Sequence, residues 1–243
     1  MDDRRSPGFL REDLENRYDV AQISEDEWHT HSGRKTDLFV QRALPALGAG
    51  QGLLLNAGCG VYKTSHAGWH EISLDLFAKP LAGKANAVCA RVEALPFRPE
   101  VFSAAVCVGE VLAYCDPAAC IRELARVLRP EGNLILDFGS TRSVRRLLGG
   151  GFGRAADVIV DDYNGSPERT WIYDPAYIKE LLNKAGFEVW REMATHRWSA
   201  TARALGLSSR RAVSIERLAG FIPFPKTLSD LRTIAAVRRT SSR

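Results

Sequence analysis

The sequence predicts an α/β fold: a doubly wound, mostly parallel seven-stranded sheet with helices on both faces. Two observations support this fold class. From Gly52 onward, short β-rich runs alternate with segments of helical periodicity, and several of these runs are apolar on both faces. Strands that alternate with helices favour parallel βαβ units, which bind ligands at the carboxyl ends of their strands.

Seven apolar runs are the expected strands. They are residues 53–57, 71–76, 86–90, 103–109, 133–138, 187–193 and 231–237. Two of the intervening helices have clear start and stop signals. One is expected to begin at Pro117 behind an Asp cap and to stop before Pro130, and the other to begin at Pro175 behind a second Asp cap and to end at Gly186.

Two inserts and one terminal segment interrupt this alternation. Residues 149–173 contain an Asn-Gly pair between two β-rich runs, which predicts a hairpin that hangs over the ligand edge as a lid. Residues 197–225 are expected to form amphipathic helices that cover the sheet rather than contact lipid. Residues 1–34 are expected to be an acidic arm or lid, with a single domain over 35–243.

Composition and charge exclude several classes of protein. The chain has 243 residues, 45% of them hydrophobic and 26% charged, which is typical of a globular domain. No apolar run reaches the roughly 20 residues of a membrane span, and residues 1–13 lack the apolar core of a signal peptide, so a cytoplasmic location is expected. The five cysteines show no metal-binding or disulfide spacing, and we expect no metal site.

The stretch LLLNAGCGVYKTSH, residues 53–66, is the first candidate for a ligand site. A triphosphate-binding loop needs glycines at two positions that Ala57 and Tyr62 occupy. A dinucleotide fingerprint would be satisfied by Gly58 and Gly60, but its third glycine is replaced by Lys63. Neither phosphate motif is therefore complete.

A series of motifs in order gives a more specific indication. The segments LLLNAGCG, EISLDL, VEALPF, FSAAVCVGEVLAY, IRELARVLRPEGNLILDF and LLNKAGFEV follow one another between residues 53 and 192. Together they resemble the class I S-adenosylmethionine-dependent methyltransferases of the small-molecule type. The resemblance implies a Rossmann-like methyltransferase fold, with S-adenosyl-L-methionine as cofactor.

The resemblance also implies a set of site residues. The Gly-Cys-Gly turn would lie under the methionine part of the cofactor, and Asp75 would accept hydrogen bonds from the ribose hydroxyls. The implied cofactor-binding residues are Asn56, Gly58, Cys59, Gly60, Lys63, Asp75, Leu76, Glu93, Ala94, Val108 and Gly109. For a cation near the cofactor carboxylate, Lys63 competes with Arg34 and Lys35.

The chain departs from the family pattern at several positions. Asn56, Arg91 and Ser103 stand where the family usually has acidic residues, and Tyr62 stands where it often has a glycine. Asp75 follows Gly60 by only 15 residues, so the first crossover helix is expected to be short or replaced by a loop.

The function implied is methyl transfer to a small-molecule acceptor through an O, N or C atom. Candidates for a catalytic base or acceptor contact are His66, His196 and Tyr114. Hairpin residues expected to contact the substrate are Asp161, Asp162, Tyr163, Arg169, Trp171 and Tyr173. Nucleic-acid methylation is disfavoured, because the residues after 103–109 lack the tetrad and the Pro-Cys pair of base methyltransferases. Alternatives are a partner protein with weak catalysis and a nicotinamide-dependent oxidoreductase, and the oligomeric state stays open.

Overall fold

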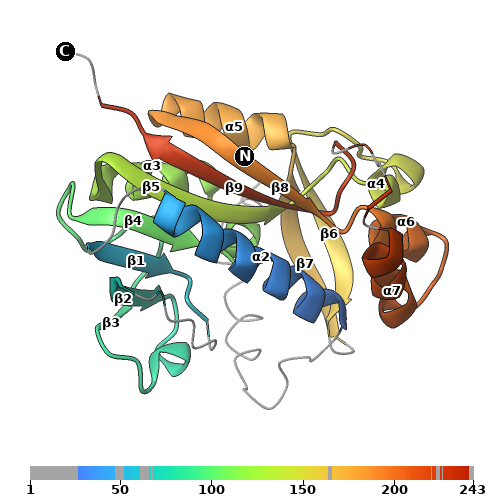
Figure 1. Ribbon diagram of the computed structural model, residues 1–243, viewed down its shortest axis with the longest axis horizontal. Coiled ribbons are helices and arrows are strands. Elements are labelled where there is room, and N and C mark those ends of the chain that lie inside the picture. Colours follow the sequence, from blue (N-terminus) through green and yellow to red (C-terminus); the bar gives the residue numbers. More distant parts are fainter. Residues whose placement is uncertain are drawn as a thin grey trace, which may run out of the picture.

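A single seven-stranded sheet forms the centre of the molecule in the computed structural model, which describes residues 27–46, 52–60, 66, 68–163, 166–219, 221–222, 225 and 227–240. The strands follow the order β3-β2-β1-β4-β5-β9-β8 and are parallel except β9, which runs antiparallel to both of its neighbours (Figure 1). Their bounds are β1 Leu53–Ala57, β2 His70–Asp75, β3 Ala87–Cys89, β4 Phe102–Cys107, β5 Leu128–Gly139, β8 Phe187–Thr195 and β9 Leu231–Arg238. The predicted fold class is confirmed.

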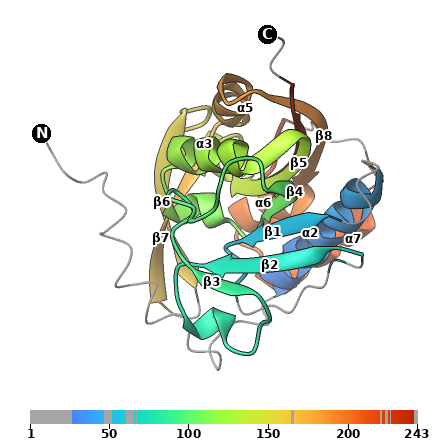
Figure 2. The same ribbon diagram turned by 90° about the vertical axis from the view of Figure 1, so that its left-hand side faces the viewer.

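Helices lie on both faces of this sheet (Figure 2). The helices described are α2 Glu27–Ala46, α3 Pro117–Val127, α4 Val144–Gly149, α5 Pro175–Lys184, α6 Trp198–Ala204 and α7 Ser209–Ala219, with 3₁₀ turns η4 Lys79–Leu81 and η5 Val111–Tyr114. One face buries the apolar sides of α3 and α5, including Leu124 and Ile178. The other face buries α2 through Phe39 and Val40 against Leu54 of β1.

The start signals of α3 and α5 are confirmed, and α3 ends before Pro130 as expected. Asp116 accepts hydrogen bonds from two backbone N–H groups of the first turn of α3, and Asp174 accepts one, from Ala176, at the start of α5. β5, however, begins at Leu128 rather than at the expected residue 133, because Leu128 already pairs with Phe102 of β4. Pairing with the neighbouring strand therefore outweighs the helical periodicity of this segment.

The expected boundary at residue 34 lies inside a helix. α2 runs from Glu27 to Ala46 without a break, although Gly33 lies within it and costs roughly 1 kcal/mol relative to alanine. The apolar stripe of Phe39, Val40, Ala43 and Leu44 packs on the sheet and stabilises the helix. The rest of the proposed arm, residues 1–26, lies outside the described residues.

The two inserts form the structures expected of them, but the second lies elsewhere. β6 Ala156–Tyr163 and β7 Ser166–Tyr173 pair antiparallel as a hairpin, whose turn residues 164–165 are not described. α6 and α7 pack on each other, with α6 also on α4 and α7 also on α2, at one end of the molecule rather than over the sheet (Figure 1). The second insert therefore packs beside the helices α2 and α4 and does not cover the sheet.

All five cysteines are free thiols. Cys107, Cys115 and Cys120 lie together in the core, where hydrogen bonds with its two neighbours and burial raise the pKa of Cys120 well above its usual range. Within the described residues, no group of three or more His, Cys, Asp or Glu side chains could hold a metal ion. No helix in the same residues is both long and apolar enough to cross a membrane.

Candidate active site at the carboxyl edge of the sheet

The turn that follows β1 closes against β2. The N–H groups of Gly58 and Cys59 both donate to the carbonyl of Leu74, at 2.8 and 3.0 Å. The N–H of Gly60 donates to Asp75 Oδ2 at 2.9 Å. Gly58 has φ +72°, and a Cβ there would lie 2.3 Å from a methyl carbon of Val111. Only glycine therefore fits at this position between β1 and the turn after β4.

Asp75 holds both of its carboxylate oxygens at the edge of the sheet. Oδ1 accepts the N–H of Phe77 at 3.1 Å, while Oδ2 accepts that of Gly60. Burial raises the pKa of Asp75, and these backbone donors oppose the shift by stabilising the charged form. A carboxylate has about four acceptor sites, and the N–H groups of Phe77, Gly60 and Leu76 occupy three of them, so about one is left for a ligand hydroxyl.

The segment after β3 is fixed by α3. The N–H of Leu95 donates to Glu123 Oε2 at 2.8 Å, and the Arg126 guanidinium donates to the carbonyls of Leu95 and Phe97 at 2.9 and 2.8 Å. These bonds hold the loop that carries Glu93 and Ala94. Because Cys89 of β3 pairs with Asp75, this loop lies at the same edge as the Gly-Cys-Gly turn.

The residues after β4 are held by a carboxylate that the sequence analysis missed. Asp137 of β5 is fully buried and accepts the N–H of Glu110 at 2.8 Å, with a further backbone bond from Gly109. Both donors have positive φ, +89° for Gly109 and +59° for Glu110. Burial raises the pKa of Asp137 to about 6 against the effect of these donors. Its signal in the sequence is an acidic residue inside the apolar run LILDF.

Asn56 contacts a second carboxylate that the sequence did not reveal. Its Nδ2 donates to Glu71 Oε1 at 2.8 Å, and His66 Nδ1 lies 2.9 Å from Glu71 Oε2. Burial alone would raise the pKa of Glu71, but the hydrogen bonds from His66 and Asn56 outweigh it and lower this pKa. β2 thus supplies a negative charge beside the position where the family usually has one on β1.

The predicted cofactor residues are therefore distributed over four adjacent strand ends. Gly58, Cys59 and Gly60 follow β1, Asp75 and Leu76 end β2, and the loop of Glu93 and Ala94 follows β3; Val108 and Gly109 follow β4. Burial raises the pKa of the Cys59 thiol, so this side chain stays uncharged. Lys63 and Tyr62 lie outside the described residues, and the described part of the crossover between β1 and β2 contains no helix.

Comparisons with known proteins agree with this geometry. A family model described as a methyltransferase domain matches residues 47–136, which include the four strand ends. Residues 47–136 therefore carry a methyltransferase domain. The resemblance inferred from the sequence motifs is confirmed, and so is its implied cofactor, S-adenosylmethionine.

The relatives of this methyltransferase domain are distant. An uncharacterized protein of Methanocaldococcus jannaschii is 28% identical over 155 residues, which span 56% of this chain and 61% of that protein. The 1,6-didemethyltoxoflavin-N1-methyltransferase of Burkholderia thailandensis, solved with S-adenosylhomocysteine, has a TM-score of 0.58 at 14% identity, covering 96% of this chain and 88% of its own. The [4+2]-cyclase SpnF has a TM-score of 0.55 at 18% identity, covering 86% and 81%. At these identities the two structures show the fold alone.

The hairpin of the methyltransferase domain is anchored beside the turn after β4. Tyr173 is buried and its hydroxyl donates to the carbonyl of Leu112 in η5 at 3.0 Å, while burial raises its pKa far above the usual range. Tyr173 therefore holds β7 in place, and its hydroxyl is not available to a substrate. Trp171 is half-buried against the core, and Arg169 is exposed. The side chains of Asp161, Asp162 and Tyr163 lie outside the described residues.

The three candidate bases occupy different surroundings. His66 pairs with Glu71 on the β1–β2 side, and Tyr114 is half-buried in η5 directly after β4. His196 follows β8, is 1% exposed and has φ +57°. The structure thus places these three residues in separate segments, the β1–β2 crossover, the turn after β4 and the end of β8, rather than in one cluster.

A hydrogen-bonded chain fixes the protonation of the His196 ring. Ser199 Oγ lies 3.1 Å from Glu216 Oε2, which already accepts the Ser199 N–H, so the hydroxyl must donate to this carboxylate. Ser199 Oγ therefore accepts a hydrogen bond from His196 Nδ1–H at 2.9 Å, which leaves Nε2 as the unprotonated nitrogen. The ring stacks on Trp28 at 3.6 Å between centroids. Burial and the nearby His31 ring lower the pKa of His196 well below its usual range.

Proposed function

We propose that this protein transfers the methyl group of S-adenosylmethionine to a small-molecule acceptor. The observation that carries the proposal is the closure of the Gly58–Gly60 turn onto Asp75, whose carboxylate still has an acceptor site for a ligand hydroxyl. Glycine conformations at the turn let a ligand approach the backbone closely. The residues present therefore fit an adenosyl cofactor.

Each strand end contributes a distinct task in this proposal. Asp75 binds the ribose hydroxyls, the loop of Glu93 and Ala94 flanks the adenine, and the Asp137-held turn at Gly109 lines the amino acid end of the cofactor. Bound S-adenosylmethionine supplies an electrophilic methyl group on a sulfonium sulfur. The protein's contribution is to align the acceptor with that group, since positioning supplies much of the acceleration in such a transfer.

The acceptor would enter between the hairpin and the N-terminal end of α2. η5 and the end of β5 both contact β7, so the hairpin flanks the site beside the turn after β4. The substrate roles of Asp162, Tyr163, Arg169 and Trp171, and the choice of base among His66, His196 and Tyr114, belong to this proposal. The small-molecule class is favoured over nucleic acid because the base-methylating motifs are absent from the sequence.

Cofactor binding tests the first half of the proposal. We expect calorimetry to detect S-adenosylhomocysteine binding to the purified protein, and native mass spectrometry to find the molecule co-purified. Asp75→Asn replaces one acceptor oxygen with a donor and should weaken binding at least ~10-fold, because hydrogen bonds to a charged group contribute about 1.5–3 kcal/mol. Glu180→Gln, at an exposed carboxylate on α5, is the matched control and should bind normally. Unchanged affinity in Asp75→Asn would contradict the assigned ribose site.

Turnover tests the second half of the proposal, methyl transfer to a small-molecule acceptor. We expect a low-molecular-weight extract to stimulate release of S-adenosylhomocysteine, and an RNA or DNA fraction to have no effect. Cofactor binding without turnover in any fraction would instead support a partner protein with weak catalysis. Stimulation by the nucleic-acid fraction alone would overturn the acceptor class while leaving the cofactor assignment intact.

A further inference from the structure

One end of the molecule exposes large apolar side chains that the fold does not use. They project from α4, from α7 and from the turns that follow α6 and α7. Their exposed fractions are 55% for Leu147, 68% for Leu148, 70% for Leu205, 73% for Leu218, 85% for Phe221 and 43% for Ile222. We call these six residues the apolar end.

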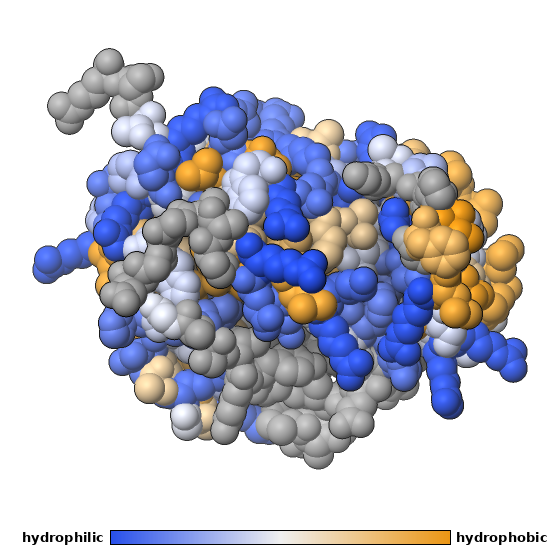
Figure 3. Space-filling view, viewed as in Figure 1, coloured by the Kyte–Doolittle hydropathy of each residue, from blue (hydrophilic) through white to orange (hydrophobic). Residues whose placement is uncertain are grey.

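The apolar end is one surface rather than scattered residues. α4 packs on α6, and α6 packs on α7, so the helices that carry these side chains are neighbours. Figure 3 shows hydrophobic residues gathered where α6 and α7 lie, with hydrophilic side chains projecting beside them. Exposed apolar residues occur singly on most soluble proteins, whereas a gathered group marks an interaction surface.

Arginines accompany this apolar end, and one of them, Arg217, pairs with Glu27 of α2 at 3.0 Å. Residues 197–222 contain five arginines and a single acidic residue, Glu216. Glu216 is buried and its oxygens accept hydrogen bonds from the backbone of Arg197 and Ser199. Its charge therefore does not reach the surface that the exposed arginines form.

The helical spacing of α7 separates this surface from the core. Ala212, Val213 and Glu216 face inward, and they are the buried residues of the helix. The exposed positions 210, 211, 214, 217 and 218 recur at intervals of three to four residues, so they form the opposite face. This face carries Arg210, Arg211, Arg217 and Leu218, and leads directly to Phe221.

The combination of exposed apolar side chains with flanking arginines restricts which kind of partner can bind this surface. A second copy of the chain docked through the same face would bring the arginines of both copies together, which disfavours self-association. Nucleic acid would pair with the arginines but not with Leu218 or Phe221. Apolar side chains flanked by basic ones are the layout of segments that lie in the interface of an anionic membrane.

We propose that the apolar end and Arg203, Arg210 and Arg211 bind the surface of an anionic phospholipid membrane. The apolar side chains enter the boundary between headgroups and acyl chains, and the three guanidinium groups contact lipid phosphates. Attachment is peripheral, since no described helix could span the membrane. This inference is independent of the proposed methyl transfer.

Vesicle co-sedimentation tests the proposal. The full chain should sediment with vesicles that contain phosphatidylglycerol, should stay in solution with phosphatidylcholine vesicles, and should be released by high salt. Arg210→Gln/Arg211→Gln should weaken partition into the vesicles about 30-fold, because each basic residue near the headgroups strengthens binding about fivefold. Leu218→Ser/Phe221→Ser should weaken it at least as much. All four side chains are exposed, so unchanged thermal unfolding should show that both variants stay folded.

Matched variants outside this surface separate the proposal from its rivals. Arg98→Gln/Arg122→Gln removes two exposed arginines elsewhere, and Leu38→Ser removes an exposed leucine of α2; both should bind vesicles like the wild type. Equal losses in the control variants would overturn the proposal, as would failure of the wild type to bind anionic vesicles. A dimer in solution that the Leu218→Ser/Phe221→Ser variant abolishes, without vesicle binding, would assign the face to self-association instead.

Discussion

Asp137 combines a buried charge with a strained turn. Its carboxylate lies in the core of the sheet, yet it accepts the N–H groups of Gly109 and Glu110, which both have positive φ. A non-glycine residue such as Glu110 rarely adopts this conformation without support from its surroundings. The buried charge is thus tied to the shape of the turn that lines the proposed cofactor site.

The raised pKa of Asp137 predicts a defined pH dependence. Between its ordinary value of 3.8 and about 6, the folded protein keeps a proton that the unfolded chain has lost. Stability should therefore fall as pH rises through this window, by about 3 kcal/mol for a shift of two pKa units. Asp137→Asn should remove that part of the pH dependence in urea unfolding measured from about pH 4 to pH 7, and should weaken S-adenosylhomocysteine binding. If the variant and the wild type have parallel stability curves, Asp137 is not the group that titrates.

The two glycines of the first turn offer a matched pair. Both have positive φ, but a Cβ at Gly58 would overlap Val111, whereas a Cβ at Gly60 meets nothing within 4 Å. Gly58→Ala should therefore destabilise the protein by several kcal/mol, while Gly60→Ala should cost about 1–2 kcal/mol from the left-handed conformation alone. If thermal unfolding shows that both variants lose the same stability, Val111 does not pack on the turn as described.

Sequence reasoning found some of these residues and missed others for a physical reason. Asp75 was identifiable because it ends a strand and follows a glycine turn in a recognisable order of motifs. Glu71 and Asp137 were missed because their roles depend on which atoms lie across the neighbouring strand. Local patterns give no information on that register. The same holds for Tyr173, whose partner Leu112 lies 61 residues away along the chain.

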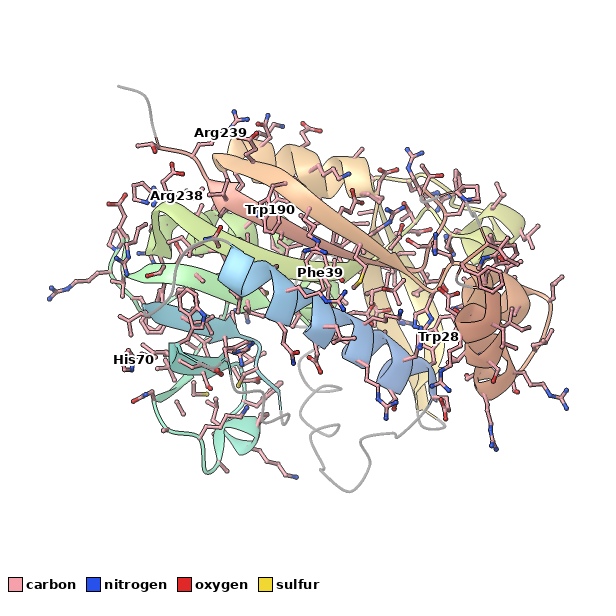
Figure 4. The ribbon with its side chains drawn as sticks, viewed as in Figure 1. Trp28, Phe39, His70, Trp190, Arg238 and Arg239 are labelled. Atoms are coloured by element: carbon pink, nitrogen blue, oxygen red, sulfur yellow. The ribbon has the colours of Figure 1, made fainter. Side chains whose placement is uncertain are left out.

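At the scale of elements, the N-terminal end of α2 is held by groups that titrate. Trp28 lies at this end, close to α7, while Phe39 lies further along the helix against the sheet (Figure 4). His196 stacks on Trp28, and Glu27 pairs with Arg217 at 3.0 Å. Burial lowers the pKa of both His31 and His196, so both rings are neutral in the folded protein near pH 7.

These histidines predict that acid loosens one end of α2. Below about pH 6.5 the opened state binds protons that the buried rings do not, so opening becomes easier as pH falls. Hydrogen exchange of residues 27–36, corrected for intrinsic rates, should increase between about pH 7 and pH 5 relative to α5. His196→Asn, which tolerates the left-handed conformation, should reduce this increase. An equal increase in α5 would point to global destabilisation instead.

The ends of helices and strands could be predicted from the sequence only where nearby residues determine them. The Asp-Pro starts of α3 and α5 were predicted, since capping needs no distant partner. The early start of β5 was not, because it depends on the pairing of Leu128 with Phe102 across the sheet. The position of α6 and α7 against α2 and α4 was not predicted either, because an amphipathic pattern does not specify which helices pack together.

For the whole molecule, the last strand occupies an interior position. β9 lies between β5 and β8, and Ile234, Ala235 and Ala236 are buried in the core. The sequence predicted a strand at 231–237 but not its place, which depends on contacts distant along the chain. Formation of the native sheet must therefore wait until β9 is present.

Truncation tests this dependence. A chain that ends after Ser229 should fail to fold, because it lacks β9 and leaves facing edges on β5 and β8. A chain that ends after Thr240 retains the strand and should unfold at nearly the same temperature as the full chain. Circular dichroism and thermal unfolding distinguish the two, and a folded product from the shorter chain would show that the sheet can close without β9.

The unequal burial of the cysteines has a practical consequence. Cys89 is the exposed thiol among the five, while the others are buried. It pairs in register with Asp75, and its Sγ lies 3.3 Å from the carbonyl of Leu76. A maleimide dye should therefore attach at this one position without removal of any native cysteine, and its emission would report ligand arrival at the neighbouring strand end in real time.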